Sequence, residues 1–166
     1  MYISGTALIN QFKEQDREDG FSIITKDENA KLFQNPNYNN AVSAFNRKDY
    51  GVAIDELNEE IKKYPDHAQA YFLLGKLYED IEFKEGKYYS KMQSNYEKYI
   101  ELKPKGKRID YVKLRVAQHY IRIGLTQQKI ELLDKAEEYL KSLDPKNSDV
   151  GMALGAIYLD KQNYDQ

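Results

Sequence analysis

The stretch that decides the fold is Ala70-Tyr71-Phe72-Leu73-Leu74-Gly75-Lys76-Leu77-Tyr78. Its core recurs as Val116-Ala117-Gln118-His119-Tyr120 and as Leu154-Gly155-Ala156-Ile157-Tyr158, and more weakly around Ala41. In the three clear copies an aliphatic residue precedes a small one, and a tyrosine follows three residues later on the same helix face. A small residue lets a neighbouring backbone approach closely, and the tyrosine fills the space beside that contact. The small residues are spaced by 34, 42 and 38 residues, which predicts a repeat of helices.

The prolines follow the same period. Pro65, Pro104 and Pro145 each come after a long helical pattern, and proline cannot continue the interior of a helix. A polar turn and a second helical pattern follow each of them. We therefore expect units at about 35–66, 67–106 and 107–146, a partial unit at 147–166, and a separate N-terminal extension or capping segment at 1–34. Within these units, Gly75 and Gly155 are expected at helix crossings and Gly124 in a turn.

The second helix of each unit is predicted from apolar residues at helical spacing with charged residues opposite them. We interpret these stripes as core, and most of the 15 tyrosines with them. The stripes consist of Ala53, Ile54, Leu57, Ile61 and Tyr64 in the first unit, Tyr89, Met92, Tyr96, Tyr99 and Ile100 in the second, and Leu132, Leu133, Ala136, Tyr139, Leu140 and Leu143 in the third.

Taken together, these patterns resemble the tetratricopeptide repeat (TPR) family. Arg47-Lys48-Asp49-Tyr50-Gly51-Val52-Ala53-Ile54 is similar to the family's turn and second-helix start, and Tyr64-Pro65-Asp66 and Asp144-Pro145 are similar to its unit ends. The resemblance covers about 35–166. It implies an all-α fold, a right-handed superhelical solenoid of antiparallel helix pairs with about three and a half repeats. Three departures from the family pattern are expected. Extra residues lie around 79–86 between the helices of the second unit, and the third unit has a longer second helix, from about Gln127 to Leu143. The first unit has Asn37 and Asn40 where bulky apolar residues are usual.

The two ends do not fit the period. Thr6 to Glu18 is expected to form a helix capped by Thr6. Phe21 to Thr25 is a short apolar run that is compatible with an extended segment. Three interpretations of 1–34 stay open: a degenerate capping helix, a flexible lead-in, or a segment lying in a groove of its own or a neighbouring molecule. At the other end, residues 147–160 predict a first helix without its partner. We interpret this as a domain cut from a longer protein, or as a place where another chain completes the repeat.

The amino-acid composition excludes several classes of function. The chain has 166 residues, 41% apolar and 31% charged, with a net charge of -2, which is a globular balance with no global attraction to nucleic acid. Because it contains no cysteine, disulfides, thiolate metal sites and cysteine nucleophiles are excluded. No run of 18 apolar residues predicts a membrane-spanning helix. Residues 1–10 lack a signal-peptide pattern, which favours a cytoplasmic location and leaves a periplasmic or membrane-tethered one open for a fragment.

The sequence contains none of the common motifs for metal binding, phosphate binding or a serine nucleophile. The sequence holds no His-Glu-x-x-His, no glycine-rich phosphate loop and no Gly-x-Ser-x-Gly. The oxygens of residues 144–149 lack the spacing of a calcium loop and favour a turn with a helix cap. The basic run Lys103, Lys105, Lys107 and Arg108 favours a solvated turn over an anion contact. We therefore expect no catalysis, no metal, no cofactor, no nucleic acid and no direct membrane insertion.

The family resemblance implies that first helices line a concave groove that binds partner peptides. The function expected is that of a protein–protein interaction adaptor or assembly scaffold. Two alternatives are a TPR arm of a longer enzyme or secretion or envelope machine, and a scaffold that self-associates through the partial repeat. Because Tyr38 and Val42 stand where chaperone-tail clamps carry lysine and asparagine, and only Arg115 matches, no such clamp is expected. The candidate partner-binding residues are Tyr38, Val42, Phe45, Asn46, Phe72, Lys76, Glu79, Asp80, Tyr111, Leu114, Gln118 and Arg122.

Overall fold

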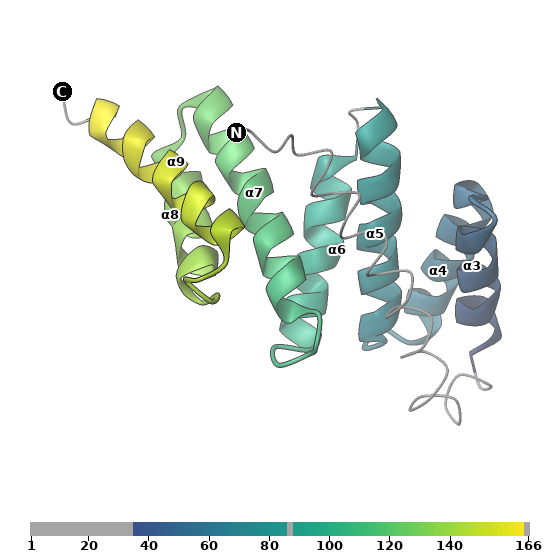
Figure 1. Ribbon diagram of the computed structural model, residues 1–166. Coiled ribbons are helices and arrows are strands. Elements are labelled where there is room, and N and C mark those ends of the chain that lie inside the picture. Colours follow the sequence, from purple (N-terminus) through teal and green to yellow (C-terminus); the bar gives the residue numbers. More distant parts are fainter. Residues whose placement is uncertain (1–34, 86–87, 165–166) are drawn as a thin grey trace.

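A computed structural model describes residues 35–85 and 88–164 of the chain, and this part is all α-helical. It contains seven helices that follow one another from one end of the molecule to the other (Figure 1). They are α3 (Pro36–Asn46), α4 (Tyr50–Lys63), α5 (Ala68–Glu85), α6 (Tyr89–Leu102), α7 (Ile109–Gln127), α8 (Ile130–Lys141) and α9 (Ser148–Tyr164).

Local sequence explains where the helices begin and end. Pro36 occupies the first turn of α3, where its missing N–H costs nothing. The Asp49 side chain caps α4 by accepting from the Val52 backbone N–H at 3.4 Å. The helices α4, α6 and α8 each stop at least two residues before a proline, as the sequence predicts. At the end of α7, Gln128 has a φ of 54°, a left-handed conformation that terminates the helix.

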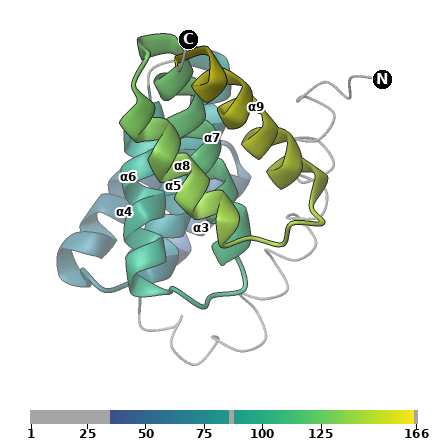
Figure 2. The same cartoon turned by 90° about the vertical axis from the view of Figure 1, so that its left-hand side faces the viewer.

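The helices pack as sequential antiparallel pairs, α3 with α4, α5 with α6 and α7 with α8. Each later pair is joined to the preceding one because α5 also contacts α4 and α7 also contacts α6. The last helix, α9, packs against α7 and α8 (Figure 2). This arrangement is consistent with a helical repeat and confirms the expected all-α fold of paired helices.

The close contact predicted at Gly75 is confirmed. A Cβ built on Gly75 would lie 2.3 Å from two ring carbons of Tyr96, whose side chain is fully buried on α6. Ala41 and Ala117 are also fully buried. The predicted apolar stripes lie in the core or pack against it, with the exception of Tyr64, which is exposed because it follows the last residue of α4.

Several expectations about the middle and end of the chain are wrong. Residues 79–85 extend α5 and do not form a separate insertion between helices. In the third pair the longer helix is the first, α7, and α8 begins only at Ile130. Gly124 lies inside α7, where a Cβ would come within 2.6 Å of Leu133. Gly155 is not at a crossing, since no atom lies within 4 Å of its Cβ position.

The expected helix at Thr6 to Glu18 and the run Phe21 to Thr25 lie outside the described residues. No helix in the described part of the chain is long and apolar enough to cross a membrane.

Candidate functional site

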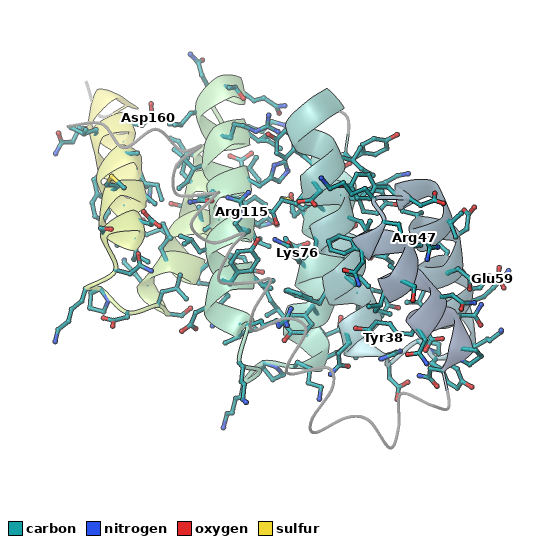
Figure 3. The ribbon with its side chains drawn as sticks, turned by 45° about the vertical axis from the view of Figure 1, so that its right-hand side comes forward. Tyr38, Arg47, Glu59, Lys76, Arg115 and Asp160 are labelled. Atoms are coloured by element: carbon teal, nitrogen blue, oxygen red, sulfur yellow. The ribbon has the colours of Figure 1, made fainter. Side chains whose placement is uncertain are left out.

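A polar cluster centred on Glu79 joins three helices in the middle of the molecule. Glu79 of α5 accepts a hydrogen bond from the Tyr96 hydroxyl of α6 at 2.6 Å and from the Tyr111 hydroxyl of α7 at 2.8 Å. Its other oxygen lies 2.7 Å from Nη2 of Arg115 on α7. Lys76, one helical turn earlier on α5, donates to the Tyr111 hydroxyl at 2.9 Å. Figure 3 shows Lys76 and Arg115 close to each other in the centre of the molecule.

The electrostatics of this cluster favour its paired, ionised form. Burial raises the pKa of Glu79, but the positive charges of Lys76 and Arg115 and the two tyrosine hydrogen bonds outweigh it and lower the pKa overall. Burial, with the Glu79 carboxylate beside it, raises the pKa of Tyr111 to about 12. The same two causes raise the pKa of Tyr96 well above its usual range. At neutral pH the carboxylate is therefore charged and both hydroxyls keep their protons.

Arg115 extends the cluster along α7. Its Nη1 donates to the Gln118 side-chain oxygen at 2.8 Å, whereas its buried Nε has no hydrogen-bond partner among the described residues. With one carboxylate against Lys76 and Arg115, the cluster carries an excess of one positive charge. It thus offers cationic and hydrogen-bonding groups from two neighbouring helices.

Two further arginines, one at the N-cap of α7 and one within the helix, lie over aromatic rings. The Arg108 guanidinium is 4.4 Å from the centroid of the Phe72 ring on α5. The Arg122 guanidinium is 3.3 Å from the centroid of the Tyr89 ring on α6. Stacking on a ring orients the planar guanidinium and leaves its N–H edges pointing outward. Both arginines are consequently held in place on the α5–α7 and α6–α7 boundaries.

The structure brings together four of the twelve predicted site residues, Lys76, Glu79, Tyr111 and Gln118, around Arg115. The others are distributed as follows. Tyr38, Phe72 and Leu114 are buried, Val42 and Phe45 are half-buried against the core, Asp80 is half-buried beside Tyr50, and Asn46 and Arg122 are exposed.

The sequence reasoning left Arg115 and Tyr96 out of the candidate set. A signal for Arg115 was present, since it lies four residues after Tyr111 and three before Gln118 and so shares their helix face. Tyr96 carried no such signal. It stands within an apolar stripe, and its hydroxyl finds Glu79 only because α5 and α6 pack side by side.

The two histidines form separate structural contacts. His67 lies 2.6 Å from the fully buried Glu60 carboxylate and contacts the Tyr38 ring. His119 is buried and stacked on Tyr89, and burial together with the charge of Arg122 lowers its pKa to about 4. In the described ranges no group of three or more histidine or acidic side chains is placed to hold a metal ion.

Comparison with models of known protein families gives no match, and no curated protein is similar to the chain at a significant level.

Proposed function

We propose that this chain is a non-catalytic protein-interaction domain of the TPR type, an adaptor or assembly scaffold that binds a peptide or a helix of a partner. The binding surface in this proposal is the side of α5 and α7 that carries Lys76, Tyr111, Arg115 and Gln118, continued on α3 by Asn46. Stacked helix pairs commonly use such an extended face for recognition.

The observation that carries the proposal is the convergence of polar side chains from two helix pairs at one place. Glu79 and Lys76 come from the second pair, and Tyr111, Arg115 and Gln118 come from the third. A cluster of this kind is preorganised, because each group is already held by its neighbours and loses little freedom when a partner binds. Arg and Tyr are also the residue types that most often anchor protein interfaces.

The protonation states support binding over catalysis. A general acid or base works best with a pKa near the operating pH. In the Glu79 cluster the carboxylate pKa is lowered and the tyrosine pKa values are raised. All three pKa values are therefore shifted further from neutral pH. The cluster is therefore suited to recognising charge and hydrogen-bonding groups.

The experiment that tests this function is affinity capture with a variant that obstructs the surface. Gln118→Trp places a bulky side chain beside Arg115, and Asn58→Trp places the same side chain on an exposed position of α4 as a matched control. We expect the native chain and the Asn58 variant to capture the same protein, and the Gln118 variant to lose it while keeping its melting temperature within a few degrees. Equal capture by all three chains would contradict a binding role for this surface.

A second candidate function, self-association through α9, is favoured by the exposed apolar side of that helix. Met152 and Leu159 are 63% and 67% exposed, and Gly151 and Gly155 have no atom within 4 Å of their Cβ positions. Gly155 follows Met152 by three residues and Gly151 by four, and Leu159 follows Gly155 by four, so the four residues share one side of α9. A helix that is apolar on two sides is usually covered on both.

Light scattering over a range of concentrations tests this second function. A scaffold that self-associates through α9 predicts a mass that rises with concentration for the native chain and stays monomeric for Leu159→Lys. Val52→Lys is the matched control, since Val52 is an exposed apolar residue of α4. A native chain that is monomeric at every concentration would exclude this function.

A further inference from the structure

Three arginines stand at seven-residue intervals, Arg108 at the N-cap of α7 and Arg115 and Arg122 within the helix. Seven residues of α-helix are close to two full turns, so Arg108 at the helix start and the two arginines after it lie along one side. At a rise of 1.5 Å per residue, successive arginines are about 10.5 Å apart along the helix axis. Tyr111 and Gln118 lie between them on the same side, which places this row on the surface proposed above for partner binding.

Each guanidinium in the row is oriented by a different contact. Arg108 is stacked on Phe72, Arg122 is stacked on Tyr89, and Arg115 is paired with Glu79. Within residues 35–85 and 88–164, the guanidinium groups of Arg108 and Arg122 have neither an ion pair nor a hydrogen bond. Among the described residues, their N–H donors therefore make no contact that a partner would have to break.

The charge of this side differs from that of the chain as a whole. The full chain carries a net charge of -2, whereas here Lys76 adds to the three arginines, and Glu79 is the carboxylate that pairs with Lys76 and Arg115. Asp160 lies on α9, toward the far end of the molecule (Figure 3). A positive surface on a weakly acidic protein attracts and orients an acidic partner.

We propose that this arginine row, Arg108, Arg115 and Arg122, recognises an acidic peptide segment whose carboxylates are about 10 Å apart. The inference rests on the interaction function proposed above and specifies the partner's chemistry. A segment in the polyproline II conformation has three residues per turn and rises about 3.1 Å per residue. Acidic residues at every third position then lie on one side of the segment, about 9 Å apart, and meet successive guanidinium groups.

A nucleic acid strand fits this surface less well than a peptide. Proteins that bind single strands combine cations with open aromatic faces on which the bases stack. Here the two rings next to the row, Phe72 and Tyr89, are already covered by Arg108 and Arg122, and Phe72 is only 7% exposed. The surface thus presents guanidinium edges suited to carboxylates.

The test is an NMR titration of the ¹⁵N-labelled chain, at low ionic strength, with a peptide of repeated Glu-Pro-Pro units. We expect the Nε–H resonances of the three arginines to shift, and no shift with the Gln-Pro-Pro peptide. The variant Arg108→Gln/Arg122→Gln should bind about tenfold more weakly, as expected for the loss of two charged contacts. The variant Lys62→Gln/Lys146→Gln removes the same net charge from exposed positions elsewhere and should bind like the native chain.

Equal weakening in the two double variants would overturn the proposal, because it would show attraction by net charge alone. Tighter binding of an oligonucleotide than of the Glu-Pro-Pro peptide would overturn it in favour of nucleic acid. The proposed function can be judged separately by partner capture. If Gln118→Trp abolishes capture and the arginine double variant does not, the acidic partner is refuted and the interaction surface stands. If no chain captures a partner, the interaction function itself fails.

Discussion

At the scale of single residues, the contact between Gly75 and Tyr96 fixes how closely α5 and α6 approach. The Tyr96 ring occupies the space that a side chain on residue 75 would need, and the ring is held by its hydrogen bond to Glu79. The same ring therefore serves the core and the polar cluster. A change at residue 75 is expected to disturb both.

Replacing Gly75 tests this contact directly. Gly75→Ala puts a methyl group 2.3 Å from the Tyr96 ring and should destabilise the chain by about 1–3 kcal/mol, the usual cost of overpacking. Gly51→Ala is the matched control, because Gly51 lies in α4 with no atom within 4 Å of its Cβ position. It should stabilise the chain by about 0.5–1 kcal/mol through helix propensity. Urea denaturation measures both, and equal effects at the two positions would refute the contact.

His119 should make stability depend on pH. Its pKa falls from the ordinary 6.5 to about 4 in the folded chain because it is buried and lies near Arg122. As the pH drops below 6.5, the unfolded chain takes up a proton that the folded chain does not, so stability is lost between pH 6.5 and about 4. The loss should amount to about 1–3 kcal/mol.

The variant His119→Phe keeps a ring against Tyr89 and removes the titration. We expect its free energy of unfolding, measured by urea denaturation at each pH, to change less than that of the native chain across this window. Parallel curves for the two chains between pH 6.5 and 4 would show that His119 does not control the acid sensitivity.

At the scale of elements, α9 is tied to α8 by polar contacts as well as by its apolar side. Lys161 donates to Glu137 at 2.6 Å and lies 2.7 Å from Asp134, and the Tyr158 hydroxyl donates to Glu137 at 3.1 Å. Hydrogen bonds from Lys141 and Lys161 lower the pKa of Glu137 to about 2. The contribution of Glu137 is consequently present above its ordinary pKa of 4.5 and is lost as the pH falls toward 2.

Lys161→Gln should loosen α9 selectively. Because partly exposed ion pairs are weak, amide hydrogens of α9 are expected to exchange about two to five times faster, with α7 unchanged. Lys146→Gln, an exposed residue of the preceding turn, serves as the control. Unchanged exchange in α9 would show that its attachment depends on apolar contacts alone.

The helices also show which features could be predicted from local sequence and which could not. Proline positions predicted the ends of α4, α6 and α8, because a missing N–H acts locally. The prediction of a turn at Gly124 was wrong. In the sequence, a glycine that ends a helix cannot be told from a glycine that makes room for a neighbouring side chain such as Leu133. The prediction of a crossing at Gly155 was wrong in the opposite way, because no neighbouring element of the described residues comes within 4 Å of its Cβ position.

At the scale of the whole molecule, the main contacts of each helix pair in the described residues are with its neighbours in sequence. Stability in such a chain is approximately a sum over units and the interfaces between them. A destabilising substitution in one helix pair should therefore leave the stability of distant pairs largely unchanged. This is the property that distinguishes a repeat from a domain with a single cooperative core.

Core truncations at the two ends test this property. Leu57 of α4 and Leu140 of α8 are fully buried, and each leucine-to-alanine change should cost about 2–5 kcal/mol. For Leu57→Ala we expect faster amide exchange in α3 and α4 with α7 and α8 protected, and for Leu140→Ala the reverse. Uniform acceleration throughout the chain in both variants would contradict a repeat organisation.

The candidate site was predictable in part at this scale. The family resemblance placed Lys76, Glu79, Tyr111 and Gln118 on helix sides that do come together. It could not show that Tyr38, Phe72 and Leu114 are buried, because whether a residue faces a partner or a neighbouring helix depends on how the pairs stack. Nor could it show that Glu79 neutralises Arg115, which requires two helices from different pairs.

We propose that partners bind on the α5–α7 side. The most direct test is a map of backbone and side-chain NMR shifts in the labelled chain when its captured partner is added. We expect the largest shifts at Lys76, Tyr111, Arg115 and Gln118, with α4, α6 and α8 little affected. Largest shifts on α4, α6 and α8, with those four residues unmoved, would contradict it.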